Sequence, residues 1–569
     1  MRAIWSFVRC GLVLVGVGLL TACGPPPIVP TDAQDLCPLS SSTFSGWFQS
    51  GTVSLNGVVN PADSTQNLNP DCDFYAWGNQ MFLWLTSPAP SAYGGGAHIF
   101  DSPTFYDVSP PDANGNRTLL AHATGVIRPF PLRIAKLGAH RLPTVIDRSG
   151  RLIEVKPADP GAKPLVRDPS GKVIEIAHAR LENRRVVLLD AEGKVIKAQH
   201  VPTLVSTSER RTDAELVPRR FIIDNLSIFI DPSLAVIDVE QGQAGDPNVL
   251  QAQTTANGSL VYYATMVNDV YAYFLTGAKK GAISTTPSNQ FPTTPTDLAN
   301  TVAFAMANGK PNPPFPDPNA LAIEVKSAWV LASGLPNLSS YITTTATVPT
   351  YNHSNPNLWT PTGQQTVQLA LVGMHVVGST AGHPEMVWAT FEHMGNTPIA
   401  SYTYMQNGGG TKTVPQSTGG PWSFASATGT SFNTPHMSFT GPGGMPSDAI
   451  QATPPFPISP SDTLRSFPFG VPGSNLFETT EVISMDNHVL SMLAAGDVRG
   501  NYFMTGATWT PFGINPQGGN AVGTNQMTNA TLETYAQGSN CFDCHQNTGS
   551  ASNPTTEISH VFGGLAPLF

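Results

Sequence analysis

The strands that decide the fold are clearest in two runs near the middle of the chain, Val367-Gln-Leu-Ala-Leu-Val-Gly-Met-His-Val-Val377 and Met386-Val-Trp-Ala-Thr-Phe-Glu-His393. Both runs are apolar and rich in β-branched or aromatic residues, which favours β-strands. Side chains alternate between the two faces of a strand. In the first run, His375 is therefore expected to point with Leu369, Leu371 and Gly373.

Two more runs of this kind lie upstream, at residues 260–267 and 321–331. Only 12% of the residues are charged, and Gly and Pro number 52 each, a composition typical of many short strands joined by turns. One early segment differs, because Phe74, Trp77, Met81, Trp84 and Leu85 recur at helical spacing and predict a helix over residues 73–86. We expect a mainly β protein with a few helices, whose β-rich body spans residues 72–500.

Residues 117–220 differ sharply in charge from the rest of the chain. They hold 20 of the 29 Lys and Arg residues against 11 acidic residues, a balance of +9, whereas the remainder carries 9 basic and 28 acidic residues, or −19. The pattern Asp-x-x-Gly-Lys/Arg-x-Ile occurs three times, with its glycines at 150, 171 and 193. Asp and Gly favour tight turns, so we expect three tandem hairpins forming a small sheet, inserted at about residues 140–200.

The basic segment suggests a possible partner. A basic sheet on an acidic body could dock an acidic redox protein. The alternative is a solvated strand surface, which is the commoner cause of such a charge run. No nucleic acid partner is expected, because aromatic stacking residues are nearly absent from the segment.

The motif that carries chemistry lies near the C-terminus, at Cys541-Phe542-Asp543-Cys544-His545. Cys-x-x-Cys-His is the attachment signature of a c-type haem. Two thiols one helical turn apart can form thioethers with one porphyrin, and His545 can then ligate the iron as proximal ligand. A redox dithiol or half of a zinc site would need only Cys541 and Cys544, but the chain lacks the βαβ context of the first and the second Cys pair of the other. We expect one covalent haem c, held by a short helical segment within residues 501–569.

The distal haem ligand is less clearly indicated. None of the 14 Met residues lies beyond Met527, and the 24 residues after His545 are too few to enclose a porphyrin. His560 follows close enough in the chain to fold back and is the favoured distal ligand. The rivals are His393, His375, Met527 and Met504.

A second metal site is also conceivable, because five potential ligands cluster within nineteen residues: His375, His383, Glu385, Glu392 and His393. No pair has clean ligand spacing on one element. The alternation along the second run places Phe391 and His393 on one face, and Trp388 and Glu392 on the other. We therefore expect hydrogen-bonded strand and loop residues here rather than a metal centre.

The N-terminus has the features of an export signal. Arg2 and Arg9 accompany an apolar stretch too short to span a bilayer, followed by Leu20-Thr21-Ala22-Cys23. This ending resembles the lipobox of bacterial lipoproteins, which implies a signal peptide over residues 1–22 and acylation of Cys23. The protein would then be anchored in the cell envelope, at the periplasmic face or the surface of the outer membrane. The Pro- and Ser-rich residues 23–71 are expected to form a tether.

Cysteine use agrees with an exported protein. Of the six cysteines, Cys10 lies in the signal, Cys23 takes lipid and the motif takes two, which leaves Cys37 and Cys72. An oxidising compartment favours a disulfide between them, which would contribute about 4 kcal/mol through chain entropy. Two buried free thiols are the alternative.

Several distinctive stretches between about residue 70 and the end occur together: Ala322-Ile-Glu-Val-Lys-Ser-Ala-Trp329, Val372-Gly-Met-His375, Val387-Trp-Ala-Thr-Phe-Glu-His-Met-Gly-Asn396, Gly500-Asn-Tyr502, Asn529-Ala-Thr-Leu-Glu-Thr-Tyr535 and the Cys-x-x-Cys-His motif. Together they resemble a family of large bacterial monohaem proteins labelled only cytochrome c family protein, with the basic hairpins as an insertion. The resemblance implies a secreted c-type haem protein and no settled substrate.

Three functions remain in competition. The first is electron transfer outside the cytoplasm by a membrane-tethered monohaem cytochrome, with a redox protein as partner. The second is a haem-dependent oxidoreductase whose body binds a substrate, and the third is a haem-based ligand sensor. Whether the protein is an enzyme stays open, because no Ser-His-Asp, P-loop or nucleotide-binding signature is present. We expect the first function.

Overall fold

The computed structural model describes residues 28–109, 116–128, 144–146, 152–159, 161–182, 185–200, 218–224, 226–237, 249–253, 258–285, 290–417, 419–425, 431–440, 449–470, 475–516, 520–524, 526–527, 529–538, 540–545 and 556–569. The structure is 31% strand and 20% helix, so the prediction of a mainly β protein with a few helices is confirmed.

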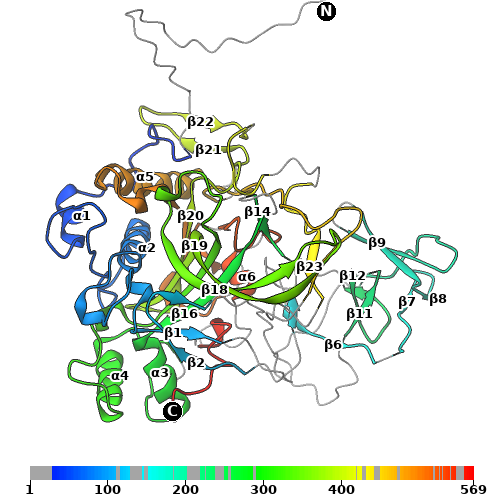
Figure 1. Cartoon of the computed structure of the whole chain (residues 1–569), viewed down its shortest axis with the longest axis horizontal. Coiled ribbons are helices and arrows are strands. Elements are labelled where there is room, and N and C mark those ends of the chain that lie inside the picture. The colour runs from blue at the N-terminus through cyan, green and yellow to red at the C-terminus, as the bar shows by residue number, and fades with distance from the viewer. Residues whose placement is uncertain are drawn as a thin grey trace, which may run out of the picture.

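One large, mostly antiparallel sheet of 12 strands organises the molecule (Figure 1). Its main path is β2-β1-β16-β17-β19-β20-β25-β26, and β18, β3, β24 and β23 attach beside it. In that order the strands are β2 (Leu119–Ala121), β1 (Phe105–Val108), β16 (Tyr262–Asn268), β17 (Ile323–Leu331), β19 (Leu358–Thr380), β20 (His383–His393), β25 (Tyr502–Trp509), β26 (Val522–Gly523), β18 (Thr343–Asn352), β3 (Val126–Ile127), β24 (Ile450–Ala452) and β23 (Met437–Phe439). The four apolar runs of the sequence form β16, β17, β19 and β20, the centre of this sheet.

The two faces of the central strands carry different side chains. One face, which we call the α2 face, presents Met374, Val376 and Phe391 to the largest apolar core. Register defines the other face, where Glu324 lies opposite Val377, and Val377 lies opposite Trp388. We call it the C-terminal face, because residues from the end of the chain cover it.

A β-bulge changes the predicted direction of His375. The register between β17 and β19 shifts between Ala328 and Trp329, so that Val372 is an extra residue on β19. A bulge exchanges the faces of the residues that follow it. His375 therefore shares the C-terminal face with Gly373, while Leu369 and Leu371 belong to the α2 face, and the predicted common phase of all four is wrong.

Helices cover the sheet and its edge. They are α1 (Ser41–Trp47), α2 (Asp71–Leu85), α3 (Asp269–Lys279), α4 (Pro295–Ala307), α5 (Leu476–Met492) and α6 (Cys541–Cys544). The predicted helix over residues 73–86 is α2, which carries Asp71 and Asp73 in its first turn, where acidic groups favour the helix dipole. Phe82 of α2 stacks on Phe391 of β20 with 4.3 Å between ring centroids, which fixes α2 against the sheet.

The segment before α2 packs into the core instead of forming a tether. Phe44, Trp47 and Phe48 are buried there, and Val59 joins the same core. The Pro- and Ser-rich composition predicts a flexible tether. Burial of these aromatic side chains stabilises a packed segment instead. The predicted tether is therefore wrong for residues 28–71, while residues 23–27 lie outside the described part.

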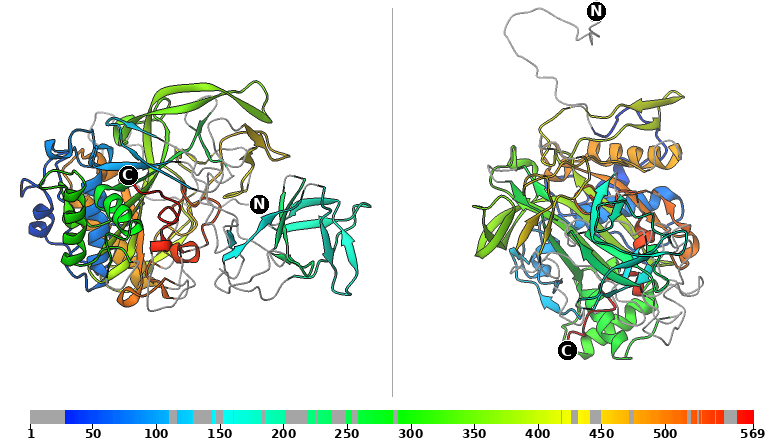
Figure 2. Two further views of the ribbon diagram at one scale, coloured as in Figure 1. Left: turned by 90° about the horizontal axis from the view of Figure 1, so that it is seen from below. Right: turned by 90° about the vertical axis from the view of Figure 1, so that its right-hand side faces the viewer.

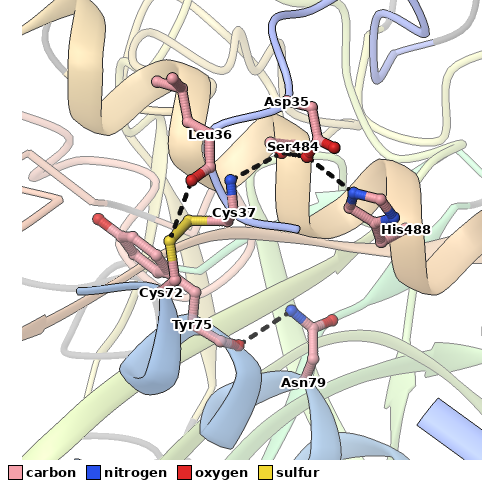
Figure 3. Close-up of a disulfide and its surroundings, with 8 residues drawn as sticks. All are labelled: Asp35, Leu36, Cys37, Cys72, Tyr75, Asn79, Ser484 and His488. Atoms are coloured by element: carbon pink, nitrogen blue, oxygen red, sulfur yellow. Dashed lines mark hydrogen bonds and ion pairs between the residues drawn. A yellow bond between two sulfur atoms is a disulfide. The ribbon is translucent and has the colours of Figure 1, made fainter. Parts of the chain in front are cut away.

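A disulfide joins this segment to α2. Cys37 and Cys72 are linked with 5.3 Å between their Cα atoms, the pairing that the cysteine count predicts (Figure 3). The backbone N–H of Cys37 also donates to the hydroxyl of Ser484 in α5. The N-terminal segment is thus connected to two helices of the α2 face.

The basic segment forms small hairpins that lie apart from the large sheet (Figure 2). The pairs are β4 (Thr144–Ile146) with β5 (Leu152–Glu154), β7 (Leu165–Arg167) with β8 (Val173–Glu175), and β9 (His178–Glu182) with β10 (Arg185–Leu189), beside a four-stranded sheet of β6 (Lys156–Pro157), β11 (Arg219–Ile223), β12 (Leu226–Ile230) and β13 (Val236–Ile237). Other two-stranded pairs are β14 (Gln251–Ala252) with β15 (Ser259–Leu260), and β21 (Tyr402–Met405) with β22 (Thr411–Val414).

The hairpin turns follow the predicted chemistry. Asp168 and Asp190 accept backbone N–H groups of their turns, and Gly171 and Gly193 have φ angles of +87° and +76°. The hairpins are separate two-stranded units, not one small sheet as predicted, and the pairs β7–β8 and β9–β10 share one apolar cluster. That cluster extends to Val236, beyond the predicted limit near residue 200.

The predicted boundary between the β-rich body and the C-terminal segment, at residue 501, differs from the observed one. β25 (Tyr502–Trp509) pairs with β20 along its length and is part of the central sheet. The C-terminal segment that lies on the sheet therefore begins after this strand.

Candidate functional site

The motif begins in a single helical turn, α6. The side chain of Asn540 accepts the N–H of Phe542, which starts the turn, and the N–H of His545 donates to the carbonyl of Cys541 at 2.8 Å. The backbone thus places Cys541 and Cys544 one turn apart, with His545 directly after them. This is the local geometry that the attachment spacing predicts.

An aromatic residue of the central sheet forms the wall of this site. Trp388 of β20 lies 4.2 Å from the ring of His545 and 6.1 Å from that of Phe542, between centroids. Phe542 is fully buried in an apolar cluster that also includes Val377 and Met527. The body therefore supplies the apolar surface that the short C-terminal segment lacks.

The last described segment, residues 556–569, which we call the C-terminal tail, is tied closely to the body. Ser559 donates to a carboxylate oxygen of Glu324 at 2.6 Å and lies 2.9 Å from the hydroxyl of Tyr271. Lys279 donates to the carbonyl groups of Gly563 and Leu565. Phe562 packs among the rings of α3 and its neighbours.

The tail in turn orients His545. Nδ1 of His545 lies 2.9 Å from the carbonyl oxygen of Ile558, an acceptor that requires the proton on Nδ1. In that tautomer Nε2 carries the lone pair. A backbone carbonyl on the other nitrogen is the usual support of a metal-ligating histidine.

His560 lies beside His545, not across from it. Their rings stack with 3.8 Å between centroids and 17° between planes. Two axial histidines point at an iron from opposite sides, with a macrocycle between their rings. A stacked pair leaves no room for a macrocycle, so the arrangement does not favour His560 as the distal ligand.

Two of the rival ligands lie on the wrong face of the sheet. His393 stacks on Tyr341 at 3.7 Å, and burial lowers its pKa to about 3. The sulfur of Met504 lies 3.8 Å from the amide of Asn79 in α2. Met504 contacts α2, and His393 packs against Tyr341 and Tyr502, so this geometry does not favour either as a ligand at the motif.

The other two rivals lie on the same side as the motif. Met527 is buried in the apolar cluster of Trp388 and Phe542. His375 is on the C-terminal face, where its Nε2 lies 2.7 Å from Glu533. Burial opposes the charge of Glu533, but His375 outweighs it and holds the pKa of that carboxyl below its usual value.

The clustered His and Glu residues of β19 and β20 do not form a metal centre in the described part of the chain. His383 pairs with Glu385 at 2.8 Å, and Glu392 pairs with Arg465, so these residues have separate partners. In the described residues, one group of potential ligands lies close together, Cys37, Cys72 and Glu481, and two of its three members form the disulfide.

The residues present fit a c-type haem in their chemistry. The motif contributes two thiol positions and a histidine whose second nitrogen is already held by Ile558. An apolar wall of Trp388, Phe542 and Val377 adjoins it. We therefore take Cys541, Cys544 and His545 as the residues that would hold the group.

Sequence reasoning missed several residues of this site. No sequence pattern links Trp388, which lies far from the motif in the chain, to the motif. None links Ser559, which lies near the C-terminus, to it either. Glu324 did carry a signal, because it is a carboxylate within a largely apolar strand.

The wider searches leave the family open. No protein-family model, curated protein or solved structure matches this chain. In the part that the structure describes, no helix has the length and apolar character needed to cross a membrane. Cys23 and the signal lie outside the described residues.

Proposed function

We propose that this chain is a membrane-tethered monohaem c-type cytochrome that transfers electrons outside the cytoplasm, a member of the large monohaem family that it resembles. The observation that carries the proposal is the orientation of His545, whose Nδ1 is held by the Ile558 carbonyl at 2.9 Å and leaves Nε2 as the ligand nitrogen. When bound, the haem supplies a one-electron redox centre.

The chain's own residues would prepare that centre in three ways. Cys541 and Cys544 attach it through thioethers, and His545 is held in one tautomer and direction. Trp388 and Phe542 exclude water from one side, which favours the less charged reduced state. The body would therefore adjust the reduction potential of the haem. This role would account for a large sheet beside a small haem-attachment segment.

Haem staining of a denatured gel tests the proposal after expression with a cytochrome c maturation system. The wild-type chain should stain, and Cys541→Ala with Cys544→Ala should remove the stain. Cys37→Ser with Cys72→Ser is the matched control and should keep it. An unstained wild-type chain, or a stained Cys541/Cys544 variant, would contradict the proposal.

For the distal ligand we now favour Met527 over His560, because Met527 shares the cluster of Phe542 while His560 stacks on His545. Thioether ligation raises the potential relative to two histidines. Optical and magnetic spectra distinguish the two arrangements. Loss of the Met-ligation band in Met527→Ala, with no change in His560→Ala, is the expected result; the reverse pattern would restore His560.

One observation supports an oxidoreductase as the second candidate. His375 and Glu533 form a hydrogen-bonded pair on the C-terminal face, with side chains 17% and 14% exposed. Such a pair can hold or deliver a proton near a bound substrate. A high-spin ferric haem that binds cyanide rapidly would move this candidate into first place.

A further inference from the structure

A half-buried carboxylate is connected to the haem site through the C-terminal tail. Glu324 of β17 accepts hydrogen bonds from Ser559 at 2.6 Å and from Tyr271 at 3.4 Å. Ser559 directly precedes His560, whose ring stacks on His545. One hydroxyl and one ring therefore link the carboxylate to the proximal histidine.

The sheet register gives an independent measure of this proximity. Glu324 lies opposite Val377, and Val377 lies opposite Trp388, which contacts His545. Directly opposed side chains in antiparallel strands are about 5 Å apart. The carboxylate therefore lies about 10 Å from the wall of the haem site.

The surroundings of Glu324 disfavour its charge. Its cross-strand neighbours, Val377 and Val267, are apolar. Burial raises the pKa of Glu324, while Lys326 on the same strand and Arg117 beside the tail lower it to a smaller extent. Lys326 also acts on Glu533, the partner of His375, so its charge is shared between two carboxylates.

We infer that the carboxylate of Glu324 binds a proton more tightly when the haem site holds an electron, so that reduction is coupled to the uptake of part of a proton. The inference rests on the proposed function. The electron comes from a one-electron donor protein, and the proton comes from solvent and bonds to a carboxylate oxygen of Glu324. No other bond forms or breaks.

The magnitude of the coupling follows from electrostatics. Reduction adds one negative charge to the site. For a separation on the order of 10 Å, taken from the distance to Trp388, and an effective dielectric constant near 20, that charge raises the proton affinity of the carboxylate on the order of tenfold. Over the pH range in which Glu324 titrates, the midpoint potential should fall by a total of about 59 mV, the equivalent of that tenfold change.

Spectroelectrochemistry of the full haem-loaded protein over a series of pH values tests the inference. The wild type should show the fall in midpoint potential, and Glu324→Gln should abolish it. Glu481→Gln is a matched control, because desolvation also raises the pKa of that carboxyl, to about 7, but it belongs to α5 on the α2 side. The control should behave as the wild type.

A second variant guards against misfolding of Glu324→Gln. Ser559→Ala keeps the carboxylate and removes a donor to its charged form, so the fall should move to higher pH. A wild-type potential independent of pH, or a pH dependence retained in Glu324→Gln or unmoved in Ser559→Ala, would overturn the inference. With haem absorbance present, such a result leaves the proposed function standing; absence of covalent haem removes both.

Discussion

The ring of His545 packs against the indole of Trp388, with 4.2 Å between their centroids, although the two residues are 157 positions apart in the chain. Trp388 is held in the middle of β20, and its indole N–H donates to the carbonyl of Glu385 at 2.9 Å. His545 therefore packs against a side chain whose position is fixed by the central sheet.

Replacing Trp388 should change the potential and not the attachment. Trp388→Ala opens the site to water, which stabilises the more charged oxidised state, so the midpoint potential should fall by on the order of 59 mV, a tenfold change in the redox equilibrium. Trp388→Phe should fall less. Trp359→Ala is the control and should leave the midpoint potential unchanged. Trp359 stacks on His353. Loss of haem stain in Trp388→Ala would contradict this role.

The charges of Glu392 and Arg465 form a buried ion pair, so the loss of either partner should destabilise the fold by leaving the other charge unpaired. Their atoms lie 2.5 Å apart with both side chains fully buried, and the other oxygen of Glu392 accepts the N–H of Ala530 at 2.7 Å. Arg465→Met leaves an unpaired buried carboxylate and should lower the free energy of unfolding by about 3–5 kcal/mol. Urea denaturation measures it.

The double variant Arg465→Met with Glu392→Gln checks the cause of that loss. A neutral amide at 392 removes the uncompensated charge and can still accept from Ala530. The double variant should therefore be more stable than Arg465→Met alone. Additive losses from the two single variants would show that the pair is not coupled.

The stability of the protein should fall at alkaline pH because of His122. Burial lowers the pKa of His122, but Asp101 and Asp107, which bond its two ring nitrogens at 2.9 and 3.1 Å, outweigh burial and raise the pKa to about 9. The pKa is higher in the folded than in the unfolded state, so this stabilisation is complete below about pH 6.5 and is lost as pH rises through about 9.

His122→Gln tests that dependence. The wild type should lose about 2–3 kcal/mol of unfolding free energy between those pH values, and the variant should lose much less. Denaturant titrations at matched pH measure both, and Asp107→Asn should show an intermediate loss. Equal slopes for wild type and His122→Gln would refute the assignment.

Much of the fold was predictable where local pattern and packing agree. The central strands and α2 follow from apolar periodicity, and the hairpin turns follow from Asp and Gly chemistry. The face of His375 was not predictable, because the one-residue bulge at Val372 depends on how β17 pairs with β19. The tether failed for a similar reason, since the burial of Phe44 and Trp47 depends on helices far along the chain.

The chemistry of the site stays a prediction from the sequence, whereas its surroundings could not be predicted. The spacing of Cys541, Cys544 and His545 indicates the cofactor from the sequence alone. The wall from Trp388 and the support from Ile558 depend on tertiary contacts. The stacking of His560 on His545 also lay beyond sequence reasoning, and His560 as distal ligand stays a prediction that this geometry does not favour.

Acylation of Cys23 is the prediction that decides localisation. Radiolabelled palmitate should enter the wild-type protein, and Cys23→Ser should release the protein from membranes into the soluble fraction. Cys10→Ser is the control and should remain attached. Unmodified soluble wild-type protein would contradict a lipid anchor.

The packing of the N-terminal segment into the core has a consequence for how an anchored protein would stand on a bilayer. The hydroxyl of Tyr402 bonds the carbonyl of Ile28, so the described chain starts fixed beside β21. Ile28 lies only five positions after Cys23, a reach of at most about 18 Å. The end of the molecule near β21 and β22 would face the lipid, and the C-terminal end lies opposite (Figures 1 and 2). An anchored protein of this kind would be held close to the bilayer with little freedom to move away from it. A redox partner would then have to diffuse to it.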